Sequence, residues 1–268
     1  MGIKFFISVS QMLLPFVLGV TVATTATGAT SYNTLFYACG IAYLVLLVLV
    51  MIFPLPDTDQ KVAGKKEGLI DSLKHTHFSV ESIAMILIGF TCTGTFQLWL
   101  NCAQTFGTEI AKIPSQNVSV MQTYYSAGTM VALFVTSVLI TKFKQVRFLV
   151  IYPAISLVML ALVYMIKTPM ICYVGAFVIG YAAAGGVLQM ATAVVNDLFP
   201  KIKGTITSLV MIASSLCNYT ILTAAAKMTS TSVIMMNIVI TAIGILLALF
   251  VNVRYGVLLK NAEEASKN

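Results

Sequence analysis

Residues 44–50, Leu-Val-Leu-Leu-Val-Leu-Val, form an unbroken aliphatic run inside an interval, Phe5–Pro56, that contains no Asp, Glu, Lys or Arg. A barrel strand in a membrane alternates between lipid-facing apolar and lumen-facing polar residues, and this run does not alternate. In lipid every backbone polar group must be satisfied within the protein, which a helix does within one segment. The run therefore predicts a membrane-spanning helix.

Uncharged intervals of helix length recur along the rest of the chain. A transmembrane helix needs about 20 apolar residues. Phe5–Pro56 is long enough for two such helices, with Thr27–Ser31 as the turn between them, and each later interval fits one crossing. The sequence therefore predicts an all-α integral membrane protein with eight transmembrane helices. The later intervals are Ser82–Thr108, Ile113–Thr141, Phe148–Ile166, Thr168–Asn196, Gly204–Ala226 and Met228–Val253.

The composition supports the same class. Hydrophobic residues make up 59% of the chain and charged residues 9%, whereas an ordinary soluble domain is roughly 25% charged. A soluble protein with so few charges would expose large apolar patches and aggregate. The lipid bilayer is therefore the predicted surrounding of this chain.

The basic residues predict the orientation, because cytoplasmic loops are enriched in Lys and Arg. With the N-terminus in the cytoplasm, thirteen basic residues fall on the inner side and three on the outer side. Both termini are then cytoplasmic, and we expect the plasma membrane as the location. The outer residues are Lys112, Lys167 and Lys227; the inner ones are Lys4, Lys61, Lys65, Lys66, Lys74, Lys142, Lys144, Arg147, Lys201, Lys203, Arg254, Lys260 and Lys267.

Several other classes of function are disfavoured by the sequence. The net charge of +7 is scattered over short loops without interleaved aromatic residues, which argues against nucleic-acid binding. All five cysteines fall inside predicted spans and are expected to be packing residues. His75 and His77 lie in a polar loop, where a metal site is a weak alternative to plain solvation. We expect no catalytic site, metal or cofactor, because no nucleophile–base pair or ligand cluster is evident.

A polar segment of mixed charge, Asp57–Ser79, follows Pro54 and Pro56 and divides the chain unequally. The predicted organisation is two helices in residues 1–54, a cytoplasmic linker in 55–78, six helices in 79–256 and a cytoplasmic tail in 257–268. The linker marks a boundary between two membrane units.

The segment Asn196-Asp197-Leu198-Phe199-Pro200-Lys201-Ile202-Lys203-Gly204-Thr205 resembles a short connection of the major facilitator superfamily of transporters, the one between helices ten and eleven. Ser137–Arg147 lies where that family repeats a basic turn. It keeps Lys142, Lys144 and Arg147, but Ser137 and Thr141 stand at the Gly and Asp positions, which puts the family's gating salt bridge in doubt. The sequence around Gly180–Thr205 is most similar to the sugar- and fucose-permease-like branches.

The resemblance implies that the six helices after the linker form the family's C-terminal bundle. The two helices before it would then be family helices five and six, without helices one to four. We expect the chain to be truncated at its N-terminus. It would then be a fragment, the product of a shortened reading frame or a sequence with a misplaced start. The alternative is a self-contained eight-helix protein, completed by a partner or by self-association.

Polar residues inside predicted spans are the candidate solute contacts, because burial in lipid costs free energy unless they face a cavity or partner. Gln97, Asn101 and Gln104 share one helical face after Thr93, and amides suit hydroxyl-rich solutes. Bonding between helices is the alternative role. Gly180, Gly185 and Gly186 are expected to permit close packing or bending, and Trp99 to fill a helix interface. The other candidate cavity residues are Tyr124, Gln189 and Asn218, with Tyr125, Thr192, Asn196 and Ser214 beside them.

The sequence thus favours a secondary transporter that works by alternating access. Its expected solute is small and polar, for example a sugar. No ionisable residue lies deep within a predicted span, so this chain carries no evident proton relay. A non-transporting membrane scaffold or inactive transporter fragment is the alternative. An intramembrane enzyme is the least favoured class.

Overall fold

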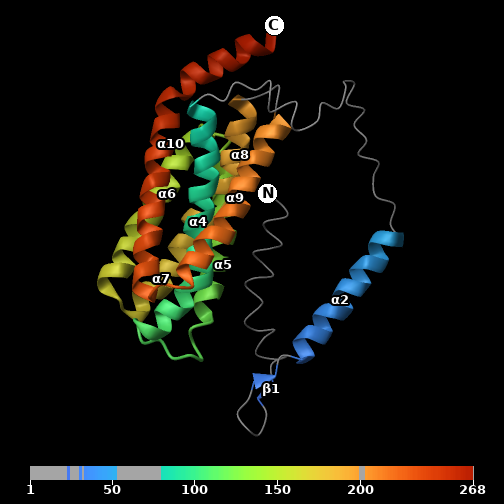
Figure 1. Ribbon diagram of the computed structural model, residues 1–268, viewed down its shortest axis with the longest axis vertical. Helices are drawn as coiled ribbons and strands as arrows, with labels where there is room; N and C mark the ends of the chain where they lie inside the picture. The colour runs from blue at the N-terminus through green and yellow to red at the C-terminus, as the bar shows by residue number, and fades with distance from the viewer. Residues whose placement is uncertain (1–22, 25–29, 32, 53–79, 199–202, 268) are drawn as a thin grey trace.

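The computed structural model describes residues 23–24, 30–31, 33–52, 80–198 and 203–267 of the chain, and these residues are almost entirely helical (Figure 1). Helix α2 (Asn33–Ile52) stands apart from a bundle formed by the helices from α4 to α10, and its described side chains are exposed. Two short strands precede α2. The predicted all-α architecture is confirmed, and the first predicted span lies outside the described residues.

The strands β1 (Ala23–Thr24) and β2 (Thr30–Ser31) pair antiparallel, with Ala23 opposite Ser31 and Thr24 opposite Thr30. Their pairing brings the chain back on itself around the turn that the sequence predicts between the first two spans. The paired residues belong to the predicted connection, and the second predicted span is the helix α2.

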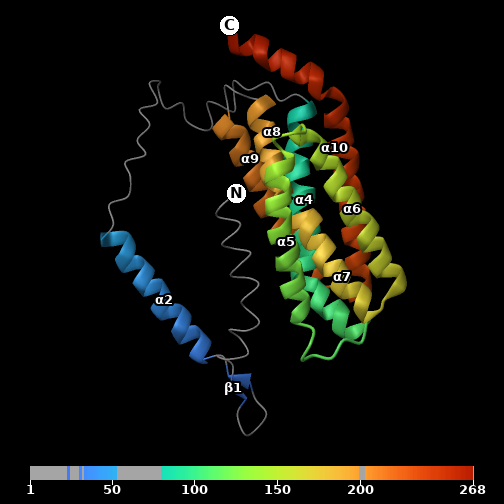
Figure 2. The same ribbon diagram turned by 180° about the vertical axis from the view of Figure 1, so that it is seen from behind.

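The bundle contains one helix for each of five predicted spans and a broken helix for the sixth. Figure 2 shows the same bundle from behind. Helix α10 continues through the predicted tail to Lys267, and its last part turns away from the bundle in Figure 1. The elements are α4 (Val80–Glu109), α5 (Val120–Leu139), α6 (Gln145–Ile166), α7 (Pro169–Ile179), the π-helical segment η1 (Gly180–Ala184), α8 (Val187–Leu198), α9 (Lys203–Ala225) and α10 (Ser230–Lys267).

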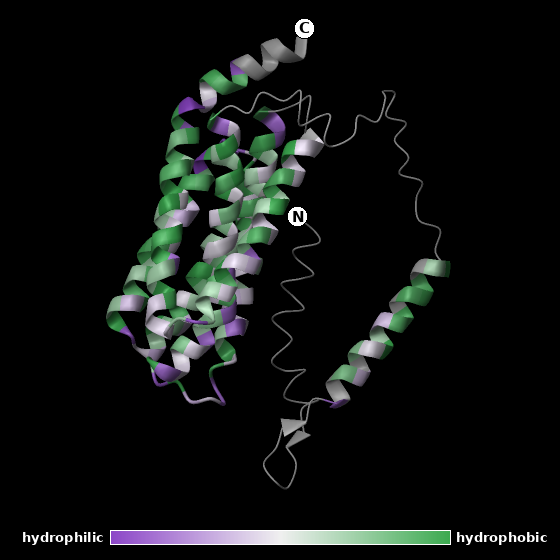
Figure 3. Ribbon diagram, viewed as in Figure 1, coloured by the Kyte–Doolittle hydropathy of each residue, from purple (hydrophilic) through white to green (hydrophobic). Residues whose placement is uncertain are grey.

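The bundle carries the features of an integral membrane protein. Within the described residues, four helices are long and apolar enough to cross a bilayer: α4, α6, Gly204–Ala225 of α9 and Ser230–Lys260 of α10. Figure 3 shows hydrophobic residues along the middle of the bundle and hydrophilic ones gathered towards its two ends. This distribution matches a hydrocarbon layer between two aqueous phases, so the chain is a multi-pass membrane protein.

Helix α4 lies at the centre of the bundle. It buries 61% of its most apolar stretch, against 22–39% for the other three long helices. Trp99 is 2% exposed and packs with Met159 and Val163 of α6, as expected for a residue that fills a helix interface. Because α4 contacts α7, α8, α9 and α10, its side chains decide how the bundle is joined.

The sixth predicted span is broken at its glycines. Gly180 begins the π-helical turn, and Gly186 has a φ of 109°, which favours glycine. A Cβ at Gly180 would lie 2.1 Å from the carbonyl oxygen of Tyr125, and one at Gly128 would lie 2.1 Å from that of Phe177. Helix α5 and the broken span therefore cross backbone to backbone, as small residues allow in membranes.

Candidate functional site

Helix α4 has two main neighbours, and they run in opposite directions. Along α4, Glu81 pairs with Arg254 and Glu109 accepts a hydrogen bond from Ser230, so α10 is antiparallel to α4. Gly89 meets Val210 of α9, whereas the later Gly94 meets Ile221, so α9 is parallel to α4. The polar side chains of α4 are divided between these two neighbours.

Buried hydrogen bonds join α4 to α10. Thr95 Oγ1 and Thr241 Oγ1 lie 2.8 Å apart, and Asn237 Nδ2 donates to the Thr95 carbonyl at 3.1 Å. The salt bridge between Arg254 Nη1 and Glu81 Oε1 measures 2.7 Å. Thr241 and Asn237 are at most 1% exposed. This interface joins α4 to α10 at both ends and in the middle.

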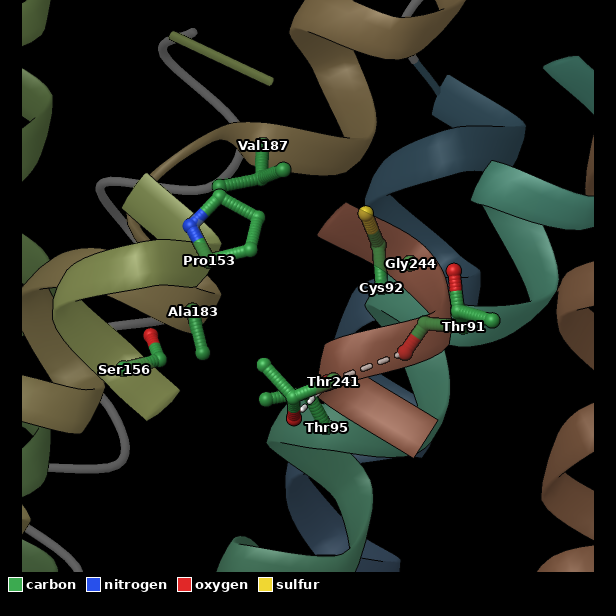
Figure 4. Close-up of a pocket in the computed structure, with 9 residues that line it drawn as sticks. All are labelled: Thr91, Cys92, Thr95, Pro153, Ser156, Ala183, Val187, Thr241 and Gly244. Carbon is green, nitrogen blue, oxygen red and sulfur yellow. Dashed lines mark hydrogen bonds between the residues drawn. The ribbon is translucent and has the colours of Figure 1, made fainter. Parts of the chain in front are cut away.

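A small cavity adjoins this interface (Figure 4). Its volume is about 10 Å³, roughly the space of one water molecule. In Figure 4, Ser156 and Pro153 of α6 face Thr95 and Thr241 across it. The cavity is therefore too small for an organic solute. Its lining residues are Thr91, Cys92, Thr95, Pro153, Ser156, Ala183, Val187, Thr241 and Gly244.

The α4–α9 interface holds the predicted amide residues. Thr93 Oγ1 and Ser214 Oγ share a hydrogen bond of 2.7 Å. Gln97 lies one turn beyond Thr93, and Asn218 lies one turn beyond Ser214. Because the two helices are parallel, Gln97 and Asn218 follow the Thr93–Ser214 bond in the same direction. We call these four residues, with Asn101, the polar seam.

Gln97 and Asn101 are joined to each other. Asn101 Nδ2 donates to the Gln97 carbonyl at 2.8 Å and to Gln97 Oε1 at 3.1 Å. Gln97 is partly exposed and Asn101 is exposed. An amide offers two N–H donors and an oxygen with two acceptor sites, so both side chains keep hydrogen-bonding capacity. Gln104, the third residue of the predicted face, is also partly exposed.

Asn218 has an unusual polar environment. Its Oδ1 is buried and has no hydrogen-bond partner within the described residues. A buried acceptor left without a partner costs about 1–3 kcal/mol. Asn218 is therefore the seam residue most in need of a donor that the described structure does not supply.

Asn101 also lines a larger pocket at the end of the seam. The pocket has a volume of about 380 Å³ and lies between the end of α4, the end of α9 and the start of α10. Thr105 and Ser230 add hydroxyl groups, and Leu222 and Val233 add apolar surface. Small-molecule sites are typically about 300–1,000 Å³, so this pocket is of a suitable size for a small solute.

The remaining predicted residues lie elsewhere. Tyr124 of α5 is 45% exposed, and its ring centroid is 5.6 Å from that of Tyr173. Tyr125 is buried. Asn196 accepts a 2.9 Å hydrogen bond from Thr207, which joins α8 to α9. Gln189 belongs to α8, but its side chain lies outside the described residues.

The sequence interpretation missed the inward polar face of α10. Asn237 and Thr241 were not among the candidates, although both are buried. Their spacing of one helical turn, matched by Thr91 and Thr95 on α4, is the signal that could have identified them. Ser126 of α5 was also missed; its buried Oγ has no partner in the described part of the chain.

A protein metal site gathers several His, Cys, Asp or Glu side chains. Among the residues that it describes, no three of these side chains lie close enough to hold a metal ion. His75 and His77 lie outside the described ranges. The cysteines Cys92, Cys172 and Cys217 are buried, Cys102 is partly exposed and Cys39 is exposed.

Comparisons with known proteins all relate this chain to membrane transport proteins. Residues 5–220 match the sequence model of the Major Facilitator Superfamily. The uncharacterized MFS-type transporter YfkL of Bacillus subtilis is 30% identical over 222 residues, which cover 81% of this chain and 54% of YfkL. The inner membrane transport proteins YdiN and YdiM of Escherichia coli are 24% and 27% identical, covering 83% and 94% of this chain and 55% and 62% of their own lengths. The chain thus spans little more than half the length of these relatives. No solved structure matches significantly.

Proposed function

Because this chain belongs to the Major Facilitator Superfamily, we propose that it provides one side of a secondary transporter for a small polar solute. The family points to a transporter rather than an enzyme. In such proteins two membrane bundles rock about a site between them near the bilayer midplane. We infer that the α4–α10 bundle is one of the two, and that further helices or a second copy complete the site.

The observation that carries this proposal is the polar seam. Gln97 and Asn101 keep hydrogen-bonding capacity on a partly exposed surface, and Asn218 holds a buried acceptor without a partner. Polar groups within a membrane span are costly unless they serve a pathway or a partner. A solute that donates hydrogen bonds would satisfy Asn218, and its acceptors would meet the amide N–H groups.

The chemistry of the seam favours an uncharged, hydroxyl-rich solute such as a sugar. Its five side chains are hydroxyls and carboxamides, which both donate and accept hydrogen bonds. None of them carries a charge that would select an anion or a cation. Tyr124, Gln104 and Gln189 belong to the same proposal as further candidate contacts of the solute.

We also propose that the protein resides in the plasma membrane with both termini in the cytoplasm. The basic residues support this orientation. Lys142 and Lys144 lie in the described connection between α5 and α6, and Arg147 lies in the first turn of α6. Lys112 and Lys167 follow the C-terminal ends of α4 and α6, on the opposite side of the bundle. Two reporters fused after residue 268 test the orientation, one that is active only in the cytoplasm and one that is active only on the outer side. Activity of the first reporter would support the orientation, and activity of the second alone would overturn it.

Solute binding to the full chain tests the proposed function. Trp99 is the only tryptophan and lies two residues from Gln97, so its fluorescence can follow binding of a panel of sugars and polyols. We expect at least one solute to bind, with Gln97→Ala and Asn218→Ala each weakening it about five- to tenfold, the effect of losing one hydrogen bond. Gln116→Ala, an exposed amide in a loop, is the matched control.

Uptake into vesicles that contain the full chain provides the second measurement. Solute-dependent uptake that falls in the Gln97→Ala variant but not in Gln116→Ala would support transport through the seam. Binding without uptake would leave the chain as a solute-binding part that needs its complementary bundle. Equal solute binding by the Gln97→Ala and Gln116→Ala variants would rule out the seam as the site.

A further inference from the structure

A groove runs along the outside of the bundle between the end of α6 and the first half of α10. It has a volume of about 440 Å³ and is lined by Tyr164 of α6, by Met228 in the connection before α10 and by residues of α10 from Thr231 to Ile240. Met235 and Val239 follow each other at one-turn spacing, and so do Met236 and Ile240. The groove is therefore an apolar channel parallel to the axis of α10.

The length of the groove matches one leaflet of a bilayer. The residues of α10 that line the groove, 231–240, extend about 15 Å at about 1.5 Å per residue. The hydrocarbon core is about 30 Å thick, so one leaflet contributes about half of that. An acyl chain lying along Met235 and Val239 would fill the groove from its polar end to the bilayer middle.

Cationic residues stand at the polar end of the groove. Lys167 is exposed, and its Nζ lies 5.5 Å from the centroid of the Tyr164 ring, which itself lines the groove. Lys227 is exposed and directly precedes Met228. Thr231 and Ser232 add hydroxyl groups to the lining. Glu109, an acidic residue at this end of the bundle, is bonded by Ser230 and is not part of the lining.

The backbone fixes where the Lys167 side chain begins. Lys167 ends α6 in the left-handed conformation, with a φ of 56°, and its N–H donates to the Val163 carbonyl. Pro169 then starts α7. The αL cap turns the chain sharply, and the lysine stem is placed over Tyr164 instead of extending into the loop. Its ammonium is therefore held beside the mouth of the apolar channel.

We propose that this groove binds one anionic phospholipid, with its phosphate between Lys167 and Lys227 and one acyl chain along Met235 and Val239. The combination of an apolar channel of leaflet length and two cations at its polar end selects this ligand. Neither sugar binding nor transport is required for it, so the proposal is independent of the proposed function.

Lipid retention by the purified full chain tests the headgroup contact. Native mass spectrometry would compare bound phosphatidylglycerol with bound phosphatidylcholine after mixing at equal concentrations. Each lysine near an anionic headgroup is worth about a fivefold preference, so we expect the double variant Lys167→Gln/Lys227→Gln to lose most of a roughly 25-fold preference. Lys112→Gln is the control, because Lys112 is also exposed with a φ of 58° but adjoins no residue that lines the groove, whereas Lys167 lies over Tyr164 and Lys227 precedes Met228.

Blocking the channel tests the acyl-chain contact. Val239→Trp should reduce retention of both lipids, whereas Val158→Trp should leave the phosphatidylglycerol preference unchanged. Val158 is a suitable control because it is 61% exposed, against 50% for Val239, and lines a different apolar groove of about 510 Å³ between α6 and α7. Helix content measured by circular dichroism shows that each variant is folded.

Three outcomes would overturn the proposal. The first is equal retention of the two lipids by the wild-type chain. The second is an unchanged preference in the double lysine variant. The third is displacement of the lipid by soluble glycerophosphate at equal concentration, which would mean that the lysines bind a free phosphate without the channel.

Discussion

Helix α4 meets α10 and α9 on different faces, and the two interfaces treat polar groups differently. Against α10, the hydroxyl of Thr95 is buried and bonded, and Asn237 donates across the interface. Against α9, Thr93 and Ser214 are bonded, but Asn218 Oδ1 is left without a partner in the described structure. Lipid tails are as apolar as the side chains, so moving an apolar side chain from lipid into a helix interface yields little free energy. Close packing and interhelical hydrogen bonds therefore hold the helices together. The α10 interface uses its polar groups for cohesion, whereas the α9 interface leaves one buried acceptor without a partner in the described residues.

The largest expected effect comes from separating α4 and α10. A Cβ at Gly244 would lie 2.8 Å from Thr91 Oγ1 and 3.1 Å from Thr91 Cβ, so Gly244→Leu must push the helices apart. We expect a loss of about 3 kcal/mol or more in the free energy of unfolding, measured by detergent-induced unfolding. Gly256→Leu on the same helix is the control, because nothing lies within 4 Å of that position. Equal losses would show that the effect is not due to the interface.

The salt bridge at one end of α4 should contribute less. Glu81 is 7% exposed, whereas the Arg254 side chain is 55% exposed and screened by water. Arg254→Ala should cost about 1–2 kcal/mol, between the values for surface and buried pairs. A double-mutant cycle with Glu81→Gln isolates the pair from the other interactions of Glu81. A coupling energy near zero would show that the pair does not fasten α10.

Two matched hydroxyl pairs compare the interfaces directly. Thr95→Val removes the Thr95–Thr241 bond of 2.8 Å, and Thr93→Val removes the Thr93–Ser214 bond of 2.7 Å. Interhelical hydrogen bonds in membranes contribute about 0.6 kcal/mol on average and at most about 1.7. We expect the Thr95 variant to lose about 1 kcal/mol and the Thr93 variant about half of that, because the latter pair is only partly buried. The reverse order in unfolding measurements would contradict the proposed difference between the interfaces.

The last effect should have the opposite sign. Asn218→Leu replaces a buried, unpartnered acceptor with a side chain of similar volume, so we expect stability to rise by about 0.5–1 kcal/mol. The same variant should weaken solute binding. A stability gain together with a binding loss would identify Asn218 as a residue kept for function. A stability loss would show that Asn218 has a structural partner.

Much of the fold could be predicted from the sequence because hydropathy in a membrane is a local signal. The absence of charge from Ser82 to Thr108 predicted the long helix α4, and Thr168–Asn196 predicted the sixth span. The break at Gly180–Gly186 was only partly evident. The glycines indicated close packing, but the sequence did not show that Gly180 would lie against the backbone of Tyr125 in α5 or that the helix would form a π-helical turn there.

The candidate site was less predictable. Gln97, Asn101 and Asn218 could be named because amides are rare in a membrane span, but their roles depend on neighbours far away in the chain. Asn237 is as polar as Asn218, yet the first is bonded to α4 and the second has no partner in the described residues. Spacing along one helix gives the face of a residue but not the helix that covers it.

The sequence by itself determined the environment, the helices and the family, because these depend on composition, on segment length and on a short connecting motif. Only the tertiary structure decided which polar groups hold the bundle together and which have no partner in the described residues. The physical reason is that hydrogen bonds between helices act over about 3 Å, and only packing brings Thr95 to Thr241 or leaves Asn218 without a donor.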